Sequence, residues 1–101
     1  MRAAVLFKPK TNLKILNNIE LPKLKRGQIL VKIIYTSICR SQIMEIEGLR
    51  GKDKYLPHCL GHEASAKVID IGKGVKKIKI NDFVILTWIK CKGIHVTNTK
   101  Y

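Results

Sequence analysis

The fold follows from the stretch Ile29-Leu30-Val31-Lys32-Ile33-Ile34-Tyr35-Thr36-Ser37-Ile38. β-Branched and aromatic side chains fill most of its positions, and Lys32 is the one charge that interrupts them. Such side chains suit the pleated, half-buried surface of a sheet. The stretch is therefore predicted to be a β-strand, and it is the strongest strand signal in the chain.

Shorter strand signals surround this stretch, separated by turn residues. Strands are expected over residues 1–7, 64–71, 75–80 and 83–89, and one strand or a strand pair over residues 13–19. Turns are expected over residues 23–28, 72–74 and 81–82. Helical composition is confined to residues 41–47, and Gly48 is expected to end that helix. Many short strands with one or two short helices favour a mainly β fold, a partly open β-barrel, over a βαβ sheet.

Composition narrows the class of protein. The chain has 101 residues, which is one domain or a piece of a larger one, and 46% hydrophobic residues, which is typical of a globular protein. The net charge of +13 favours anionic partners such as nucleic acid. The charges are nevertheless spread singly, and the densest run, Lys73 to Lys79, has no interleaved aromatic residue. Nucleic-acid binding therefore ranks last among the functions considered.

The cysteine count and the apolar runs indicate the compartment. Three cysteines, an odd number, argue against a disulfide framework. The apolar run at the N-terminus is too short for a signal peptide, and no stretch approaches the ~20 apolar residues of a membrane helix. We expect a reduced cytoplasmic chain without a membrane partner.

Two short motifs carry groups that bind metal. Cys39-Arg40-Ser41 offers a thiol beside a hydroxyl, and Gly61-His62-Glu63 offers an imidazole beside a carboxylate. A lone cysteine is most often a buried apolar residue, and a lone histidine is most often structural. Together, however, thiolate and imidazole are ligands that zinc prefers, and a catalytic zinc needs three protein ligands and an open position. The motifs indicate part of such a site.

In order and spacing, these motifs resemble the N-terminal GroES-like catalytic domain of the zinc-dependent medium-chain alcohol dehydrogenases. The resemblance runs from residue 1 to about residue 89. Its carriers are Gly61-His62-Glu63 with Gly72 and Val75 behind it, the upstream Cys39-Arg40-Ser41, and the turn Asn81-Asp82-Phe83-Val84. Three ordered motifs make the match specific. A false match is Gly72-Lys73-Gly74, which lacks the third glycine of a dinucleotide-binding fingerprint.

The resemblance implies a role for each motif residue. Cys39 and His62 match two ligands of the catalytic zinc, and Glu63 matches the acidic neighbour of the metal. Ser41 matches the hydroxyl that passes on the proton of the substrate alcohol. Arg40 matches a residue that approaches the pyrophosphate of the cofactor. NAD or NADP is expected only in a full-length form, and so is a small alcohol or sugar-like substrate.

The sequence also departs from the family pattern. Gln42 stands where the family usually has an aspartate that acts in support of the zinc-bound histidine, and an amide is a weaker acceptor. Ala66 and Asn81 replace glycines, which predicts altered turns. Cys91 has no nearby cysteines with which to form the family's structural zinc lobe, and we expect an incidental thiol there. For Cys59 we expect a packing role, and for His58 a loop role.

Residues 1–101 are thus expected to be an incomplete GroES-like domain without a Rossmann domain. The predicted function is the N-terminal portion of an alcohol or polyol dehydrogenase that is inactive as this chain alone. Alternatives are a small β-barrel binding module without catalysis and, last, a basic nucleic-acid binder. Exposed strand edges predict self-association, which light scattering would detect.

Overall fold

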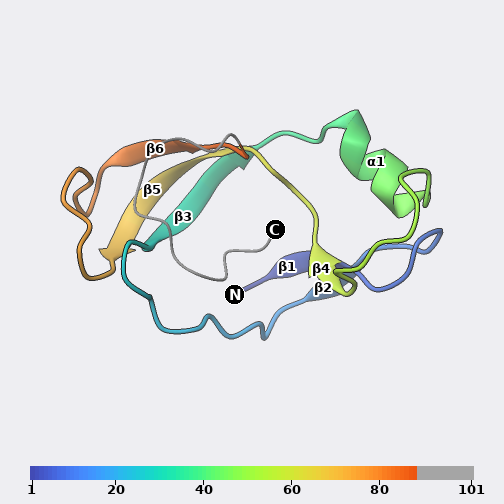
Figure 1. The fold of residues 1–101 in the computed structure, drawn as a ribbon, viewed down its shortest axis with the longest axis horizontal. Coiled ribbons are helices and arrows are strands. Elements are labelled where there is room, and N and C mark those ends of the chain that lie inside the picture. Colours follow the sequence, from blue (N-terminus) through green and yellow to red (C-terminus); the bar gives the residue numbers. More distant parts are fainter. Residues whose placement is uncertain (89–101) are drawn as a thin grey trace. The chain divides into compact units, whose positions relative to one another are not determined.

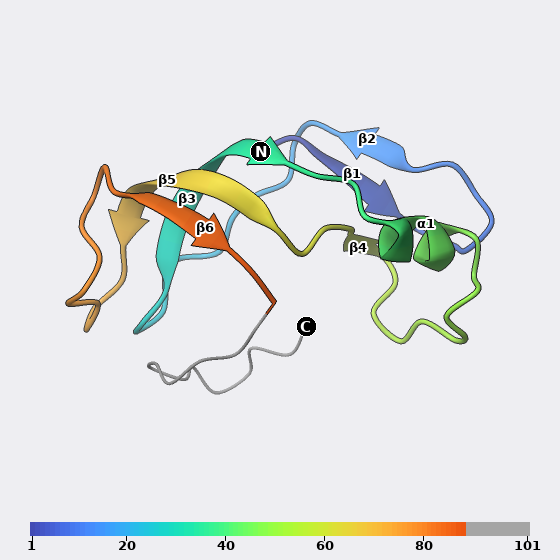
Figure 2. The same ribbon diagram turned by 90° about the horizontal axis from the view of Figure 1, so that it is seen from above.

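The computed structural model describes residues 1–88 and is mainly β, as predicted. Its elements in chain order are β1 (Ala3–Leu6), β2 (Lys14–Leu16), β3 (Ile29–Thr36), α1 (Arg40–Ile46), β4 (His58–Cys59), β5 (Ala64–Ile71) and β6 (Phe83–Leu86). Within these residues the strands form two three-stranded antiparallel sheets, ordered β2-β1-β4 and β3-β5-β6, and they do not close into one barrel (Figures 1 and 2).

The described residues divide into two compact units, one around each sheet. The first unit consists of residues 1–21 and 37–61, and the second consists of residues 22–36 and 62–88. The chain passes from the second unit to the first after β3 and returns to the second before β5. None of the helices in residues 1–88 is long and apolar enough to cross a membrane.

In the first unit, β1 is the central strand of its sheet. It pairs with β2 on one side and with β4 on the other. Leu6 is fully buried and Val5 nearly so, and they form the core of this unit. Gly48 follows α1 with a φ of +68°, a conformation that glycine adopts without steric cost. The predicted helix and its predicted end are confirmed.

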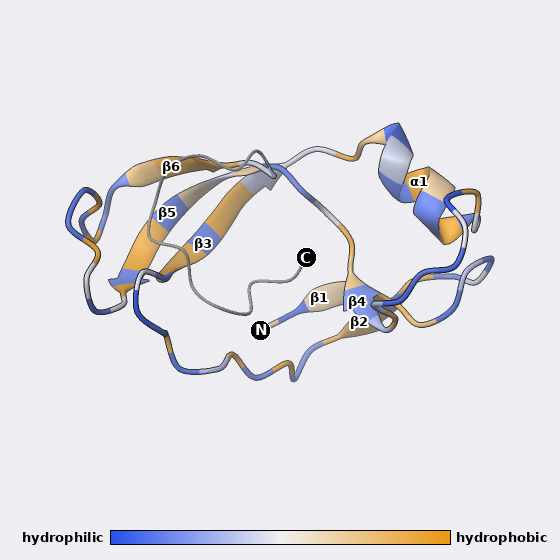
Figure 3. Cartoon of the chain, in the orientation of Figure 1, coloured by the Kyte–Doolittle hydropathy of each residue, from blue (hydrophilic) through white to orange (hydrophobic). Residues whose placement is uncertain are grey.

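In the second unit, β5 is the central strand and carries the core. Ala66 and Val68 are fully buried on one face of β5, which we call the inner face. Ala66 lies between Ile33 of β3 and Val84 of β6. The strand predicted at residues 64–71 is confirmed residue for residue. Apolar residues dominate β3 and β6 as well (Figure 3).

Gly72 lets two loops of the second unit approach each other closely. Its N–H donates to the carbonyl of Gln28 at 2.7 Å, and the N–H of Gly27 donates to the carbonyl of Lys73 at 2.9 Å. A Cβ on Gly72 would lie 2.3 Å from the carbonyl oxygen of Lys25, closer than atoms can approach. The structure therefore gives a steric reason for the spaced glycine in the motif.

Two strand predictions need correction, and one strand was not predicted. The alternating residues 75–80 form no strand, because a turn follows Gly72 and no neighbouring strand pairs with them. The strand expected at residues 13–19 is reduced to β2, and β4 was not predicted because two residues are too few to show a period.

The two substituted glycine positions differ in their local backbone structure. Asn81 takes a φ of +77°, as a glycine would, and asparagine tolerates that conformation better than most residues. Ala66 lies in β5 and not in a turn. Asparagine at position 81 thus takes the backbone conformation that glycine allows, and at position 66 there is no turn.

Candidate functional site

Both motif segments leave the second sheet from the same rung. Thr36, the last residue of β3, pairs with Ala64, the first residue of β5. The Thr36 hydroxyl also donates to the carbonyl of Glu63 at 2.7 Å, which ties the two strand ends together. Cys39 follows this rung by three positions and His62 precedes it by two. The candidate ligands divide between the units, with Cys39 in the first and His62 and Glu63 in the second.

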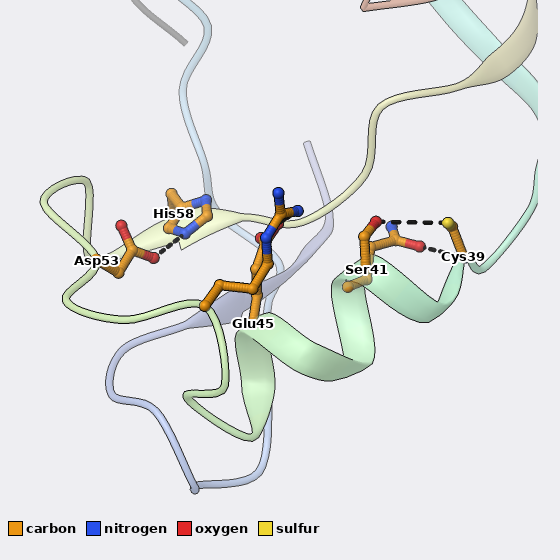
Figure 4. Close-up of polar contacts among 7 residues, drawn as sticks. Cys39, Ser41, Glu45, Asp53 and His58 are labelled. Carbon is orange, nitrogen blue, oxygen red and sulfur yellow. Dashed lines mark hydrogen bonds and ion pairs between the residues drawn. The ribbon is translucent and has the colours of Figure 1, made fainter.

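Cys39 precedes α1 directly and is half-buried. Its backbone is extended, with φ −95° and ψ 151°, as expected for a residue that caps a helix. The Ser41 hydroxyl donates to the Cys39 sulfur at an Oγ–Sγ distance of 3.4 Å (Figure 4). The structure thus brings together the predicted metal ligand and the predicted proton-transfer hydroxyl.

Gln42 holds the backbone of Cys39 in place. Its side chain is 9% exposed, and its Oε1 accepts the N–H of Cys39 at 2.6 Å. In return, the Gln42 N–H donates to the Cys39 carbonyl at 3.0 Å. The sequence had suggested only a weakened support for the metal at this position. The spacing of a capping box, with Gln three residues after the cap, is the signal that would have revealed this second role.

Gln42 also lies against the glycine of the second motif. A Cβ on Gly61 would be 3.5 Å from Nε2 of Gln42, and Gly61 has a φ of +129°, a conformation that side chains rarely adopt. Gly61 lies in the first unit like Gln42, so this amide bridges the start of α1 and the residue before His62.

The remaining motif residues are accessible. Arg40 opens α1 and is exposed, His62 is half-buried at a bend, and Glu63 is exposed just before β5. The donor types, a thiol and an imidazole with a carboxylate beside it, suit zinc. Within each unit of the described part of the chain, no three His, Cys, Asp or Glu side chains gather as a complete metal site. Cys91 lies outside the described residues.

Asp53 and His58 form an ion pair that the sequence did not reveal. His58 Nε2 lies 2.6 Å from Asp53 Oδ2 (Figure 4). The N–H of Tyr55 donates to Asp53 Oδ1 at 2.8 Å. The hydrogen bond from Tyr55, with the bond and charge of His58, outweighs partial desolvation and holds the pKa of Asp53 below its ordinary value. His58 thus lies in β4 and not in a loop. Cys59 is exposed, so its predicted packing role is wrong.

The fold and the two motifs together define a small β domain that carries side chains of the types that bind zinc. Comparison with known proteins agrees with this description. The family model described as the alcohol dehydrogenase GroES-like domain matches residues 25–100. The chain belongs to this family.

Curated relatives are whole dehydrogenases. An alcohol dehydrogenase of Geobacillus stearothermophilus is 37% identical over 89 residues, which is 88% of this chain and 26% of the relative. An S-(hydroxymethyl)glutathione dehydrogenase of Escherichia coli is 34% identical over 92 residues, 91% of this chain and 24% of the relative. The chain therefore spans about a quarter of the length of the relatives it matches.

Proposed function

We propose that this chain is the N-terminal portion of a zinc-dependent alcohol or polyol dehydrogenase that uses NAD or NADP. Family membership and the names of the relatives support the reaction class. The observation that carries the proposal is the arrangement around Cys39, where a cap fixes the backbone and a hydroxyl reaches the sulfur. A metal-binding thiol beside a proton-transfer hydroxyl suits the metal-assisted oxidation of an alcohol.

In this proposal Cys39 and His62 supply two of the three protein ligands of the zinc, and Glu63 is the acidic group beside them. The third ligand comes from the part of the whole protein beyond the matched quarter. A bound zinc supplies Lewis-acid stabilisation of negative charge on the substrate oxygen.

Ser41 and Arg40 act on the substrate and the cofactor. The Ser41 hydroxyl accepts the proton that the substrate alcohol loses and passes it on, a step that requires hydrogen-bond reach. Arg40 is exposed at the first position of α1. Its guanidinium is suited to a bidentate grip on the cofactor's pyrophosphate.

Catalysis belongs to the whole protein in this proposal, and the 101-residue chain alone is inactive. A nicotinamide cofactor needs a domain of its own, and the substrate pocket for a small alcohol or sugar-like molecule is completed there. A reducing, cytoplasmic setting follows from the need to keep the Cys39 thiol free for metal.

Cobalt titration of the purified chain tests the metal site. Co²⁺ takes the place of zinc and gives a thiolate-to-metal charge-transfer absorption only when a cysteine sulfur binds it. We expect this band in the wild-type chain, and we expect the Cys39→Ser change to abolish it. The His62→Ala change should weaken the affinity at least tenfold, because one of two strong ligands is lost. A band that survives Cys39→Ser would refute the assignment.

The chain contains a matched control for the thiol. Cys59 is also a free cysteine, and it is exposed on β4. The Cys59→Ser change should leave the band and the affinity unchanged. Loss of the band in Cys59→Ser would show that Cys59 binds the metal and would contradict the assignment to Cys39. Separately, alcohol oxidation with NAD or NADP by the isolated chain would contradict its proposed inactivity.

A further inference from the structure

The outer face of the β3-β5-β6 sheet combines exposed rings with lysines. Because paired residues on neighbouring strands point to the same side of a sheet, each rung of the ladder defines a row of side chains. One row is Lys32, Lys67 and Phe83, and the adjacent row is Tyr35, Ser65 and Ile85. We call these six residues the lysine–aromatic face.

This face is opposite to the core of the unit. On β5, Ala66 lies between the two rows and Val68 lies just beyond Lys67, and both are fully buried on the inner face. By contrast, Tyr35 is 76% exposed, Phe83 75% and Ile85 84%. Large apolar side chains that are this exposed and adjacent on a sheet indicate a surface that binds something.

The charges of the face indicate an anionic partner. The Lys67 ammonium lies 5.9 Å from the centre of the Phe83 ring, and Lys32 is exposed in the same row. Residues 22–36 and 62–88 hold nine lysines and arginines against three acidic residues. Two of those acids bind the backbone of their own turns, since Asp70 accepts the Ile71 N–H and Asp82 accepts the Lys79 N–H.

We propose that the lysine–aromatic face binds single-stranded nucleic acid, a function beyond the proposed dehydrogenase. A strand that crosses the sheet would meet the Tyr35 ring on β3, the Lys67 ammonium on β5 and the Phe83 ring on β6. Unpaired bases stack on such rings while lysines neutralise the phosphates. In a duplex the bases already stack on one another, so the rings have no partner there. An acidic peptide would pair with the lysines but would make no stacking contact with the aromatic rings.

The chain order hides this surface. The densest run of lysines in the sequence, from Lys73 to Lys79, contains no aromatic residue, and for this reason nucleic-acid binding ranked last among the functions expected from the sequence. Lysine and aromatic side chains become neighbours only through the register of the antiparallel strands, which places Lys67 beside Phe83, sixteen positions later in the sequence.

Fluorescence polarisation with a labelled oligothymidylate tests the proposal. The wild-type chain should bind the single strand more tightly than a duplex of the same length, with an affinity that falls as salt rises. Each of the changes Tyr35→Ala and Phe83→Ala should weaken binding by at least about fivefold, which is the lower limit of one base–ring stack. Circular dichroism should show an unchanged fold, because both rings are exposed. Equal binding of strand and duplex, or no effect of the ring changes, would overturn the proposal.

A pair of charge-matched variants separates the face from net charge. Lys32→Gln/Lys67→Gln removes two charges from the face, and Lys76→Gln/Lys77→Gln removes two from the loop between β5 and β6. The first should weaken binding and lower the salt slope by about 1.4, while the second should have a clearly smaller effect. Equal losses would assign binding to overall charge and overturn the proposal.

Sedimentation of the chain alone tests the competing occupant. A self-associating chain that Phe83→Ala makes monomeric, with no oligonucleotide binding, would assign the face to a second copy and overturn the proposal. A monomer that binds the oligonucleotide supports it.

Discussion

Replacing Gly72 by alanine should destabilise the second unit for a steric reason that can be worked out atom by atom. The new Cβ would lie 2.3 Å from the carbonyl oxygen of Lys25 and 2.8 Å from that of Gln28. Both are backbone atoms, so no side-chain rotation relieves the clash, and the two loops must separate. Their separation strains or breaks the hydrogen bonds of the Gly72 and Gly27 N–H groups.

The expected cost follows from these contacts. Two backbone hydrogen bonds contribute about 1 kcal/mol each, and overpacking a tight contact costs about 1–3 kcal/mol. Partial relief of the strain when the bonds break leaves a loss of about 2–4 kcal/mol in the free energy of unfolding. Urea denaturation followed by circular dichroism measures this loss. Amide hydrogen exchange at Gly27 and Gly72 reads the second unit directly, and protection there should fall.

Gly51 provides a matched control in the first unit. A Cβ there would meet nothing within 4 Å, and only its φ of +84° disfavours a side chain. Gly51→Ala should therefore cost about 1 kcal/mol and leave exchange at Gly27 and Gly72 unchanged. The steric reasoning is refuted if Gly72→Ala unfolds within about 0.5 kcal/mol of the wild-type chain with both amides still protected.

Three further changes test the cap, the ion pair and the turn. Gln42→Met keeps the size of the side chain but leaves the Cys39 N–H without its acceptor, so the free energy of unfolding in urea should fall by about 1–3 kcal/mol. Gln42→Glu retains an acceptor oxygen and should lose much less stability. Equal losses in the two variants would contradict the capping role of Gln42. The pKa of Asp53 is depressed in the folded state, so the carboxylate stabilises the fold above the ordinary carboxyl pKa, and this stabilisation is lost as pH falls through the folded-state pKa. Asp53→Asn should therefore reduce the loss of stability that the wild-type chain shows below about pH 4. An unchanged dependence of stability on acid pH would count against the pairing with His58. Asn81→Val should lower the melting temperature by an amount that corresponds to about 1–2 kcal/mol, because a branched side chain disfavours a φ of +77°. Asn81→Gly should not lower the melting temperature. Similar melting temperatures for the two variants would argue against a positive φ at position 81.

The fold was predictable where many residues point to one answer. Residues 64–68 of β5 alternate between small apolar residues on the inner face and Ser65 and Lys67 on the outer face, and that is enough to fix a strand and its phase. Residues 75–80 alternate too, yet they form no strand, because alternation records only which residues suit a sheet and not whether a partner strand is present.

The site was predictable in its residues but less so in its contacts. Residue type and the family resemblance singled out Cys39, Ser41 and His62, and in the structure the Ser41 hydroxyl donates to the Cys39 sulfur. The bond from the Cys39 N–H to Gln42 and the pairing of His58 with Asp53 depend on where side chains point after folding. A single sequence records the types of these groups and not their directions.

The irregular register of β3 has a consequence for how this sheet can change through insertions and deletions. Ile33 pairs with Ala66 and Tyr35 pairs with Ser65, so β3 uses two positions where β5 uses one, and Ile34 is the extra residue. Deleting Ile34 would leave the first five rungs in place and would let Tyr35 follow Ile33 directly, at the position opposite Ser65. Tyr35 and Thr36 would then keep their partners Ser65 and Ala64, and therefore the faces on which they lie now. Loss of one codon at this point would spare both faces of the sheet, whereas loss of one codon at a regular rung would move every later residue of the strand to the other face.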